Sequence, residues 1–251
     1  MVDLNAPVWK ELSSAGSDTE KLLSRLLSGK GDFREDLKIL DENLSHQLSY
    51  YNATAYALPH LAALCGKLSP EDRFFLIAHM GAAIAAEGET PLVPGTTEYQ
   101  EFHEGLRGLA PVAEDLIQNH LDLLDNAPYE ERSMFVLGAL AVLGDRRRAY
   151  ILYFLSGSCW EEAPAACACG WEDECVLLKE PECCIEAAEI PPWDGKSLNE
   201  EAVWVKGLLE RAEDEDIGPV IPLLYGTGVC PECGKRESYW NWYDRFMNDV
   251  E

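Results

Sequence analysis

The residues best suited to chemistry are two pairs of cysteines, and a glycine directly follows each pair. The first pair is Cys167 and Cys169, and the second is Cys230 and Cys233. Two residues between thiols let both sulfurs face one ion, and the glycine tolerates the positive φ that such a turn often needs. Thiolates from two such turns fill the four-coordinate shell of a structural zinc and leave no position for substrate. The spacing therefore predicts one closed zinc site at these four cysteines.

The first pair is the less regular one, because a single residue separates Cys167 from Cys169. A different cysteine could therefore replace Cys167 as the fourth ligand, and the candidates are Cys175, Cys183 and Cys184. The alternative is that the clustered cysteines are buried, reduced and without metal, since free cysteine is among the most buried residue types. A catalytic zinc is not expected, because such sites commonly use histidine and all five histidines stand at or before residue 120.

Composition narrows the classes of partner. Forty-five acidic against 20 basic residues give a formal charge of −25, which repels nucleic acid and anionic membranes and attracts basic proteins. Residues 1–10 lack a basic start with an apolar stretch, and no apolar run reaches the roughly 20 residues that cross a bilayer. Nine cysteines is an odd number, which argues against a complete disulfide framework. We therefore expect a soluble, cytoplasmic protein that binds neither nucleic acid nor membrane.

Residues 8–155 predict an all-α fold, because apolar side chains recur at three- and four-residue steps. The clearest stripe is Phe102, Leu106, Leu109, Val112, Leu116, Asn119 and Leu124. Pro111 is expected to break that stretch in two. A second stripe ends at Gly66, and Ser69 with Pro70 then predicts the cap and first turn of a helix that carries residues 74–86.

Further helices are predicted at residues 6–15, 18–28, 33–47, 130–143 and 146–156. The resulting pairs recur at about 35 to 45 residues, a period typical of HEAT or armadillo helix pairs, which stack into an α-α superhelix with a concave surface. The same stripes also allow an ordinary compact helical bundle.

The character of the chain changes after Gly157. We expect HEAT-like helical repeats in residues 1–157 and a Cys-rich insertion in 158–193, with short strands at 175–178 and 184–190. Residues 194–226 should add further helices to the array, one of them at 200–212. Residues 227–251 should form a zinc knuckle and an aromatic tail that covers the small core of the zinc module. The tail aromatics are Tyr239, Trp240, Trp242, Tyr243 and Phe246.

Other polar residues are expected to have structural roles. The histidines lack the spacing that places two imidazoles on one helical face. His46 and Gln47 stand at a helix junction and could fasten one repeat to the next through hydrogen bonds to the backbone. The acidic runs 172–174 and 213–216 are expected to solvate loops rather than to bind a partner.

Residues 44–61 resemble a family of bacterial HEAT-repeat proteins, whose motif has a leucine, His-Gln, a tyrosine, Ala-Thr and an apolar-Pro-x-Leu ending. The matching positions are Leu44, His46, Gln47, Tyr51, Ala53, Thr54, Leu58, Pro59 and Leu61. The opening helix and turn of that family are similar to Trp9, Leu12, Ala15, Gly16, Ser17, Leu22 and Leu23. Agreement covers residues 1–65 well and the rest mainly through helical character and the Cys-Pro-x-Cys-Gly turn at residue 230.

The sequence departs from that family where Leu48, Ser49 and Tyr50 replace the usual Gly-Thr-Val. The resemblance implies an α-α superhelix, and some members are associated with bacterial toxin and immunity loci. It supplies no active site.

The leading hypothesis is a non-catalytic scaffold whose acidic surface binds a basic protein, in one version an immunity protein that neutralises a toxin. The alternative is a helical-repeat enzyme, a lyase or a modifying enzyme, that uses Cys65, Cys159 or a carboxylate in its groove. A reactive thiolate needs an electropositive setting, which this acidic chain offers mainly at residues 146–148. A third hypothesis makes the zinc module itself a recognition element.

Overall fold

The computed structural model describes residues 1–157, 163–175, 200–214, 217, 221, 225, 227–230 and 232–249. The chain divides into two compact units, Met1–Tyr153 and Phe154–Glu251, which we describe separately. Helices dominate the described residues, so the expected helical class is confirmed, and two small antiparallel sheets accompany them in the second unit. Among the described residues, no helix has the length and apolar character needed to cross a membrane.

The first unit is built of α-helices and short 3-10 helices. The 3-10 helices are η1 (Pro7–Lys10), η2 (His46–Leu48) and η3 (Ala86–Gly88). The α-helices are α1 (Thr19–Ser28), α2 (Phe33–Ser45), α3 (Asn52–Cys65), α4 (Pro70–Ala85), α5 (Thr97–Asn119), α6 (Leu121–Asn126), α7 (Tyr129–Leu143) and α8 (Arg146–Gly157), the last of which spans the boundary between the units.

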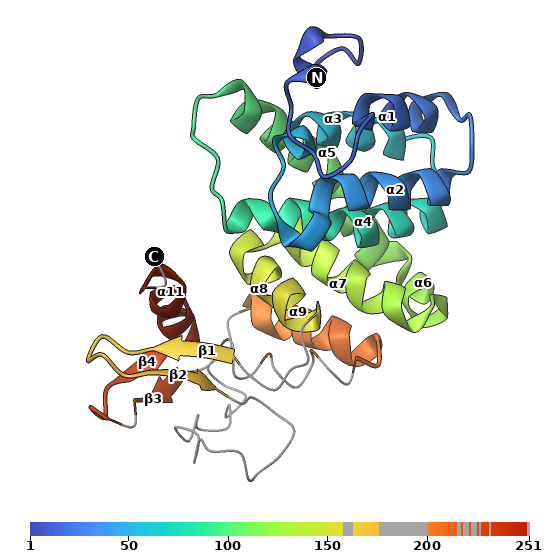
Figure 1. The fold of residues 1–251 in the computed structure, drawn as a ribbon. Helices are drawn as coiled ribbons and strands as arrows, with labels where there is room; N and C mark the ends of the chain where they lie inside the picture. Colours follow the sequence, from blue (N-terminus) through green and yellow to red (C-terminus); the bar gives the residue numbers. More distant parts are fainter. Residues whose placement is uncertain are drawn as a thin grey trace. The chain divides into compact units, whose positions relative to one another are not determined.

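These helices stack in two layers. In one layer α3 packs against both α1 and α5, and in the other α4 packs against both α2 and α7. Figure 1 shows the second layer as α2, α4 and α7 lying one below the other. Helices α1 to α5 thus alternate between the two layers along the chain, and α7 then joins the layer of α2 and α4.

Glycines bring helices of one layer unusually close. A Cβ on Gly81 of α4 would lie 2.4 Å from the Cα of Gly138 in α7, and a Cβ on Gly105 of α5 would lie 2.4 Å from the Cβ of Leu58 in α3. No real Cβ fits at such distances, so only glycine permits these crossings. Beside the α4–α7 crossing, Phe74 and Phe135 stack with ring centroids 4.2 Å apart.

Most predicted helices are present, and the start of α4 follows the sequence signal closely. Ser69 Oγ accepts a hydrogen bond from the Asp72 backbone N–H, and Pro70 occupies the first turn. Along α5 the apolar stripe is buried at Phe102, Leu106, Leu109 and Leu116, as is Leu124 of α6.

The prediction that Pro111 breaks this stretch is wrong, because α5 runs unbroken from Thr97 to Asn119. Proline removes one helical hydrogen bond, but Pro111 lies on the exposed side of α5, where water can satisfy the carbonyl that loses its donor. The helix ends instead at His120, whose backbone is no longer helical at φ −135°.

Two predicted helix ends are also corrected. Only Pro7–Lys10 of the predicted helix 6–15 is helical, as a 3-10 turn, and α2 ends at Ser45 rather than at residue 47. Gln47 adopts a left-handed backbone with φ 55°, which cannot continue a right-handed helix.

The idea that His46 and Gln47 fasten neighbouring helices is not supported. Both side chains are exposed, and neither forms a hydrogen bond within the described part of the chain. Other polar groups join this junction: Thr54 Oγ1 donates to the Leu44 carbonyl at 3.3 Å, and Asn52 Oδ1 accepts from the Ser13 backbone N–H at 2.6 Å.

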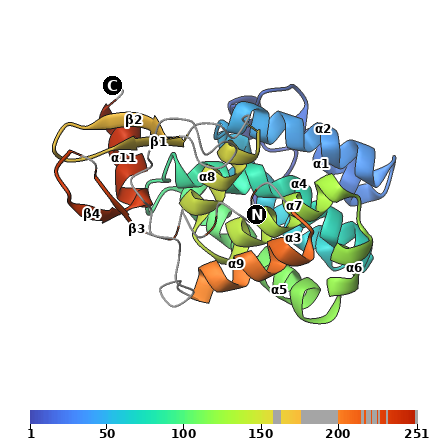
Figure 2. The same cartoon turned by 90° about the horizontal axis from the view of Figure 1, so that it is seen from below.

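The described residues of the second unit form two β-hairpins and several helical segments. Strands β1 (Ala163–Ala166) and β2 (Glu172–Cys175) pair antiparallel, as do β3 (Thr227–Val229) and β4 (Arg236–Ser238). Helix α9 (Glu200–Arg211) matches the predicted helix at 200–212, and α11 (Tyr239–Asp249) packs against β1 and β4 (Figure 2). Of the predicted strand 175–178 only Cys175 is described, as the end of β2, and 184–190 lies outside the described residues.

Candidate metal centre

All four predicted ligands stand in the turns of the two hairpins. Cys167 and Cys169 lie between β1 and β2, and Cys230 and Cys233 lie between β3 and β4. Their Sγ atoms all lie within 4.8 Å of one another. The fold therefore brings together two cysteine pairs that are more than 60 residues apart in the sequence.

The spacing of the sulfurs suits a tetrahedral metal site. Across the two turns, the Sγ atoms of Cys167 and Cys233 are 3.7 Å apart, and those of Cys169 and Cys230 are also 3.7 Å apart. Four thiolates placed tetrahedrally about 2.3 Å from zinc would have sulfurs about 3.8 Å apart. A disulfide would require about 2.05 Å, so these cysteines are not paired in that way.

The two turns have the same backbone design despite their different lengths. Cys167 N–H donates to the Trp171 carbonyl at 2.7 Å, and Cys230 N–H donates to the Lys235 carbonyl at 2.9 Å. In each turn the glycine N–H also donates a hydrogen bond to the carbonyl of the first cysteine, at 2.9 Å. Gly170 and Gly234 have φ of 93° and 69°, which favour glycine at both positions.

This shared design explains how Cys167 can join the cluster with one residue before Cys169. The first turn is simply one residue shorter, and both of its sulfurs still face the second turn. Among the alternatives considered from sequence, Cys175 pairs with Ala163 at the far end of the hairpin from the turn. Cys183 and Cys184 lie outside the described residues.

Backbone N–H groups point at the sulfurs and favour thiolates. Burial raises the pKa of Cys230, but hydrogen bonds to its sulfur outweigh this effect and lower the pKa to about 7. The donors are the backbone N–H groups of Cys233 and Glu232 and the thiols of Cys167 and Cys233. Burial raises the pKa of Cys167 to about 12, against the hydrogen bond from the Cys169 N–H. A bound cation would favour loss of the thiol protons in this cluster.

An aromatic core supports both hairpins. Tyr239, Trp242 and Tyr243 of α11 are 0–1 % exposed, so these three of the five tail aromatics are buried as expected. Trp171, next to the first turn, packs edge to face on Trp242 with ring centroids 5.7 Å apart. The Trp240 side chain lies outside the described residues, and Phe246 is half-buried.

An ion-pair cluster ties α11 to the hairpins. Arg245 donates to the Glu237 carboxylate through its two terminal guanidinium nitrogens, Nη1 and Nη2, at 2.6 and 2.8 Å, and Nη1 also donates to the Ala166 carbonyl at 3.3 Å. Lys235 reaches the same carboxylate at 2.6 Å. Hydrogen bonds from Arg245 and Lys235 lower the pKa of Glu237 to about 2. This cluster could not be foreseen from the sequence, because Glu237 and Arg245 belong to no motif.

The other residues with candidate chemistry are dispersed and structural. Burial raises the pKa of Cys65 to about 11, so its thiol stays protonated. His60 Nε2 bonds the Val2 carbonyl at 2.8 Å, and His79 Nδ1 contacts Asp41 at 3.2 Å. Within the described residues, the four cysteines form the one group of three or more potential ligands close enough to share an ion.

The prediction for the acidic run 213–216 needs one correction. Asp214 does not solvate a loop: it is 7 % exposed, and its carboxylate accepts a hydrogen bond from the Ile217 backbone N–H. The prediction of a loop at 172–174 is also wrong, because these residues form most of strand β2 and pair with β1, although Glu172 itself is exposed. Cys159, a candidate nucleophile, lies outside the described residues.

Comparison with known proteins adds no relative. No family model, no curated protein and no solved structure matches the chain. The resemblance of residues 1–65 to bacterial HEAT-repeat proteins therefore stays a prediction, and the chemistry of the site rests on its own geometry.

Proposed function

We propose that the protein is a non-catalytic binding scaffold whose C-terminal unit is held together by one structural zinc ion. The observation that carries this proposal is the set of four sulfurs within 4.8 Å of one another, two of whose separations are 3.7 Å, close to the value in a tetrahedral thiolate site. Cys167, Cys169, Cys230 and Cys233 would be the ligands. Zinc with four thiolates has no position left for water or substrate, so the ion would stabilise the fold and not take part in a reaction.

Zinc matters here because the two hairpins are too short to be stable alone. Their strands have four and three residues, and isolated two-stranded hairpins are marginal in water. Structural zinc contributes on the order of 10 kcal/mol to the folding of small modules. Loss of the ion would therefore separate the two turns.

The helical part is proposed to be a HEAT-like α-α superhelix over residues 1–157. Support comes from the two layers, in which α3 packs on α1 and α5 while α4 packs on α2 and α7. Alternation of successive helices between two stacked layers is how helical-repeat arrays bury their apolar faces. Such arrays bind partners over an extended concave surface. The assignment of 194–226 to the array and of 158–193 to an insertion remains part of this proposal.

The partner is proposed to be a basic protein, because the formal charge of −25 favours association with positive surfaces and disfavours nucleic acid and anionic membranes. In the narrower version the protein is a bacterial immunity protein in the cytoplasm, and the partner is a nuclease toxin that is basic where it meets nucleic acid. The resemblance of residues 44–61 to bacterial HEAT-repeat proteins supports this version.

The test is affinity capture from the native host followed by reconstitution. We expect one basic protein that rebinds the purified chain at fixed stoichiometry, with an association rate that falls steeply between about 0.05 and 0.3 M salt. If the captured protein were acidic, or if its association rate did not change with salt concentration, the proposal that opposite charges drive binding would be contradicted.

The enzyme alternative keeps its own test, although no observation in the described residues favours it. A helical-repeat lyase or modifying enzyme that uses a thiol would show one anomalously fast cysteine outside the two turns. Titration of the folded protein with a thiol reagent measures this directly, and Cys159 is the residue to follow because Cys65 is buried.

A further inference from the structure

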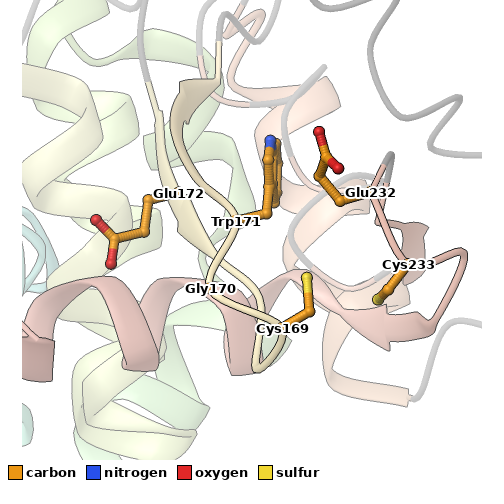
Figure 3. Close-up of a pocket in the computed structure, with 6 residues that line it drawn as sticks. All are labelled: Cys169, Gly170, Trp171, Glu172, Glu232 and Cys233. Carbon is orange, nitrogen blue, oxygen red and sulfur yellow. The ribbon is translucent and has the colours of Figure 1, made fainter.

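A cavity of about 530 Å³ opens beside the cysteine turns of the second unit. It is lined by Cys169, Gly170, Trp171, Glu172, Glu232 and Cys233. Figure 3 shows the Glu232 carboxylate beside the Trp171 indole, with Cys169 and Cys233 below them and Glu172 on the other side of Trp171. Both turns therefore contribute to one surface hollow, and its walls combine an aromatic ring with negative groups.

The indole wall is firmly placed. Trp171 is half-buried and packs edge to face on the fully buried Trp242, while its backbone carbonyl accepts the Cys167 N–H. An indole face held in this way attracts cations through its quadrupole, and arginine guanidinium stacks on it best because both groups are planar.

The charges around the cavity also favour a cation. The Glu232 carboxylate is exposed and makes no ion pair within the described part of the chain. Lys235 and Arg245 both bind Glu237, at 2.6 Å each, so the Glu237 carboxylate offsets one of their two positive charges and draws both groups to itself. Four thiolates around a divalent ion would add a net double negative charge at the cavity floor, through the exposed Cys169 and Cys233.

We propose that this cavity binds an arginine side chain of a basic protein segment, with the guanidinium stacked on Trp171 and paired with Glu232. The inference rests on the proposed function and deepens it, because it names where a basic partner is recognised and by which residues. Arginine is favoured over lysine, since its planar fork can stack on the indole and bond the carboxylate at the same time.

The experiment measures binding of a fluorescent peptide, with four arginines alternating with serines, to the purified full chain at about 0.15 M salt, where the Debye length is about 8 Å. Matched peptides carry lysine or neutral citrulline in place of arginine. The variants are Glu232→Gln and Trp171→Leu, and Glu200→Gln is the control because it removes the same charge from the same unit outside the cavity. Zinc content is recorded for every protein.

We expect the arginine peptide to bind at least about fivefold tighter than the lysine peptide, and the citrulline peptide to bind hardly at all. Glu232→Gln should weaken arginine binding at least about fivefold and Glu200→Gln less than about twofold. The indole N–H signal of Trp171 in a two-dimensional NMR spectrum, identified by its loss in Trp171→Leu, should shift on saturation.

Equal weakening by Glu232→Gln and Glu200→Gln, or an unmoved Trp171 signal, would overturn the inference and show diffuse attraction to an acidic protein. Trp171→Leu could lose zinc because its leucine no longer packs on Trp242. The comparison of Glu232→Gln with Glu200→Gln, and the Trp171 signal of the wild type, then test the arginine site without that variant. Failure here with one zinc per chain leaves the structural zinc proposal standing, whereas a metal-free wild-type protein overturns that proposal instead.

Discussion

Replacement of Gly81 by alanine tests the layered packing of the first unit. A Cβ at this position would lie 2.1 Å from Tyr153 Oη and 2.4 Å from the Cα of Gly138, and the latter is backbone that cannot rotate away. To accommodate the methyl group, α4 and α7 must move apart. Overpacking of this kind costs about 1 to 3 kcal/mol, and such a backbone clash falls at the upper end.

Alanine also has an intrinsic advantage over glycine in a helix, of about 1 kcal/mol. The net expectation for Gly81→Ala is therefore a loss of about 2 kcal/mol in the free energy of unfolding of the first unit. At a urea m-value of about 2 kcal/mol/M, the unfolding midpoint falls by about 1 M.

Urea unfolding followed by far-ultraviolet circular dichroism measures this shift. Gly66→Ala is the matched control, because Gly66 has an ordinary helical backbone and its added Cβ would meet only the Ala63 carbonyl at 3.8 Å. We expect the control to match or exceed wild-type stability. If Gly81→Ala were as stable as Gly66→Ala, the close approach of α4 and α7 would be refuted.

Three further predictions concern the first unit. Phe135→Ala removes a ring that is 1 % exposed and stacked on Phe74, and it should cost about 3 to 5 kcal/mol in chemical unfolding. Burial lowers the pKa of His60 below its usual 6.5, against the hydrogen bond to Val2, so its stabilising effect is present above pH 6.5 and is lost as the pH falls. His60→Gln should therefore reduce the stability difference between pH 7.5 and 5.5. Cys65 should react with a thiol reagent only after unfolding. If Cys65 of the folded protein reacted as fast as an exposed thiol, its burial would be contradicted.

The cysteine cluster could be predicted from sequence because its signal is local. A cysteine pair followed by glycine fixes a turn, and Cys230 with Cys233 has the spacing that such turns use. The meeting of this turn with Cys167 and Cys169 is a long-range event, and chemistry alone suggested it. The hairpins were not predicted, since strands such as Ala163–Ala166 are too short to show alternation.

The helices of the first unit were predictable for a similar reason. The predictions were wrong where tertiary contacts, and not local sequence, determine the structure. Apolar spacing identified α3, α4 and α7, whereas Pro111 gave a misleading stop signal because the exposure of its helix face is not visible in sequence. Asp214 was predicted to be exposed because its neighbours are acidic, but the fold buries it and its carboxylate accepts a hydrogen bond from the Ile217 backbone N–H. Local propensity is a weak guide at such positions.

Four sulfurs from two hairpin turns are proposed to share one ion. The most direct test is the zinc content of the protein purified without added metal, measured for the wild type and for Cys169→Ser and Cys230→Ser, one cysteine from each turn. We expect one zinc per wild-type chain and its loss in both variants. A folded wild-type protein without metal, or full zinc retention in either variant, would contradict it.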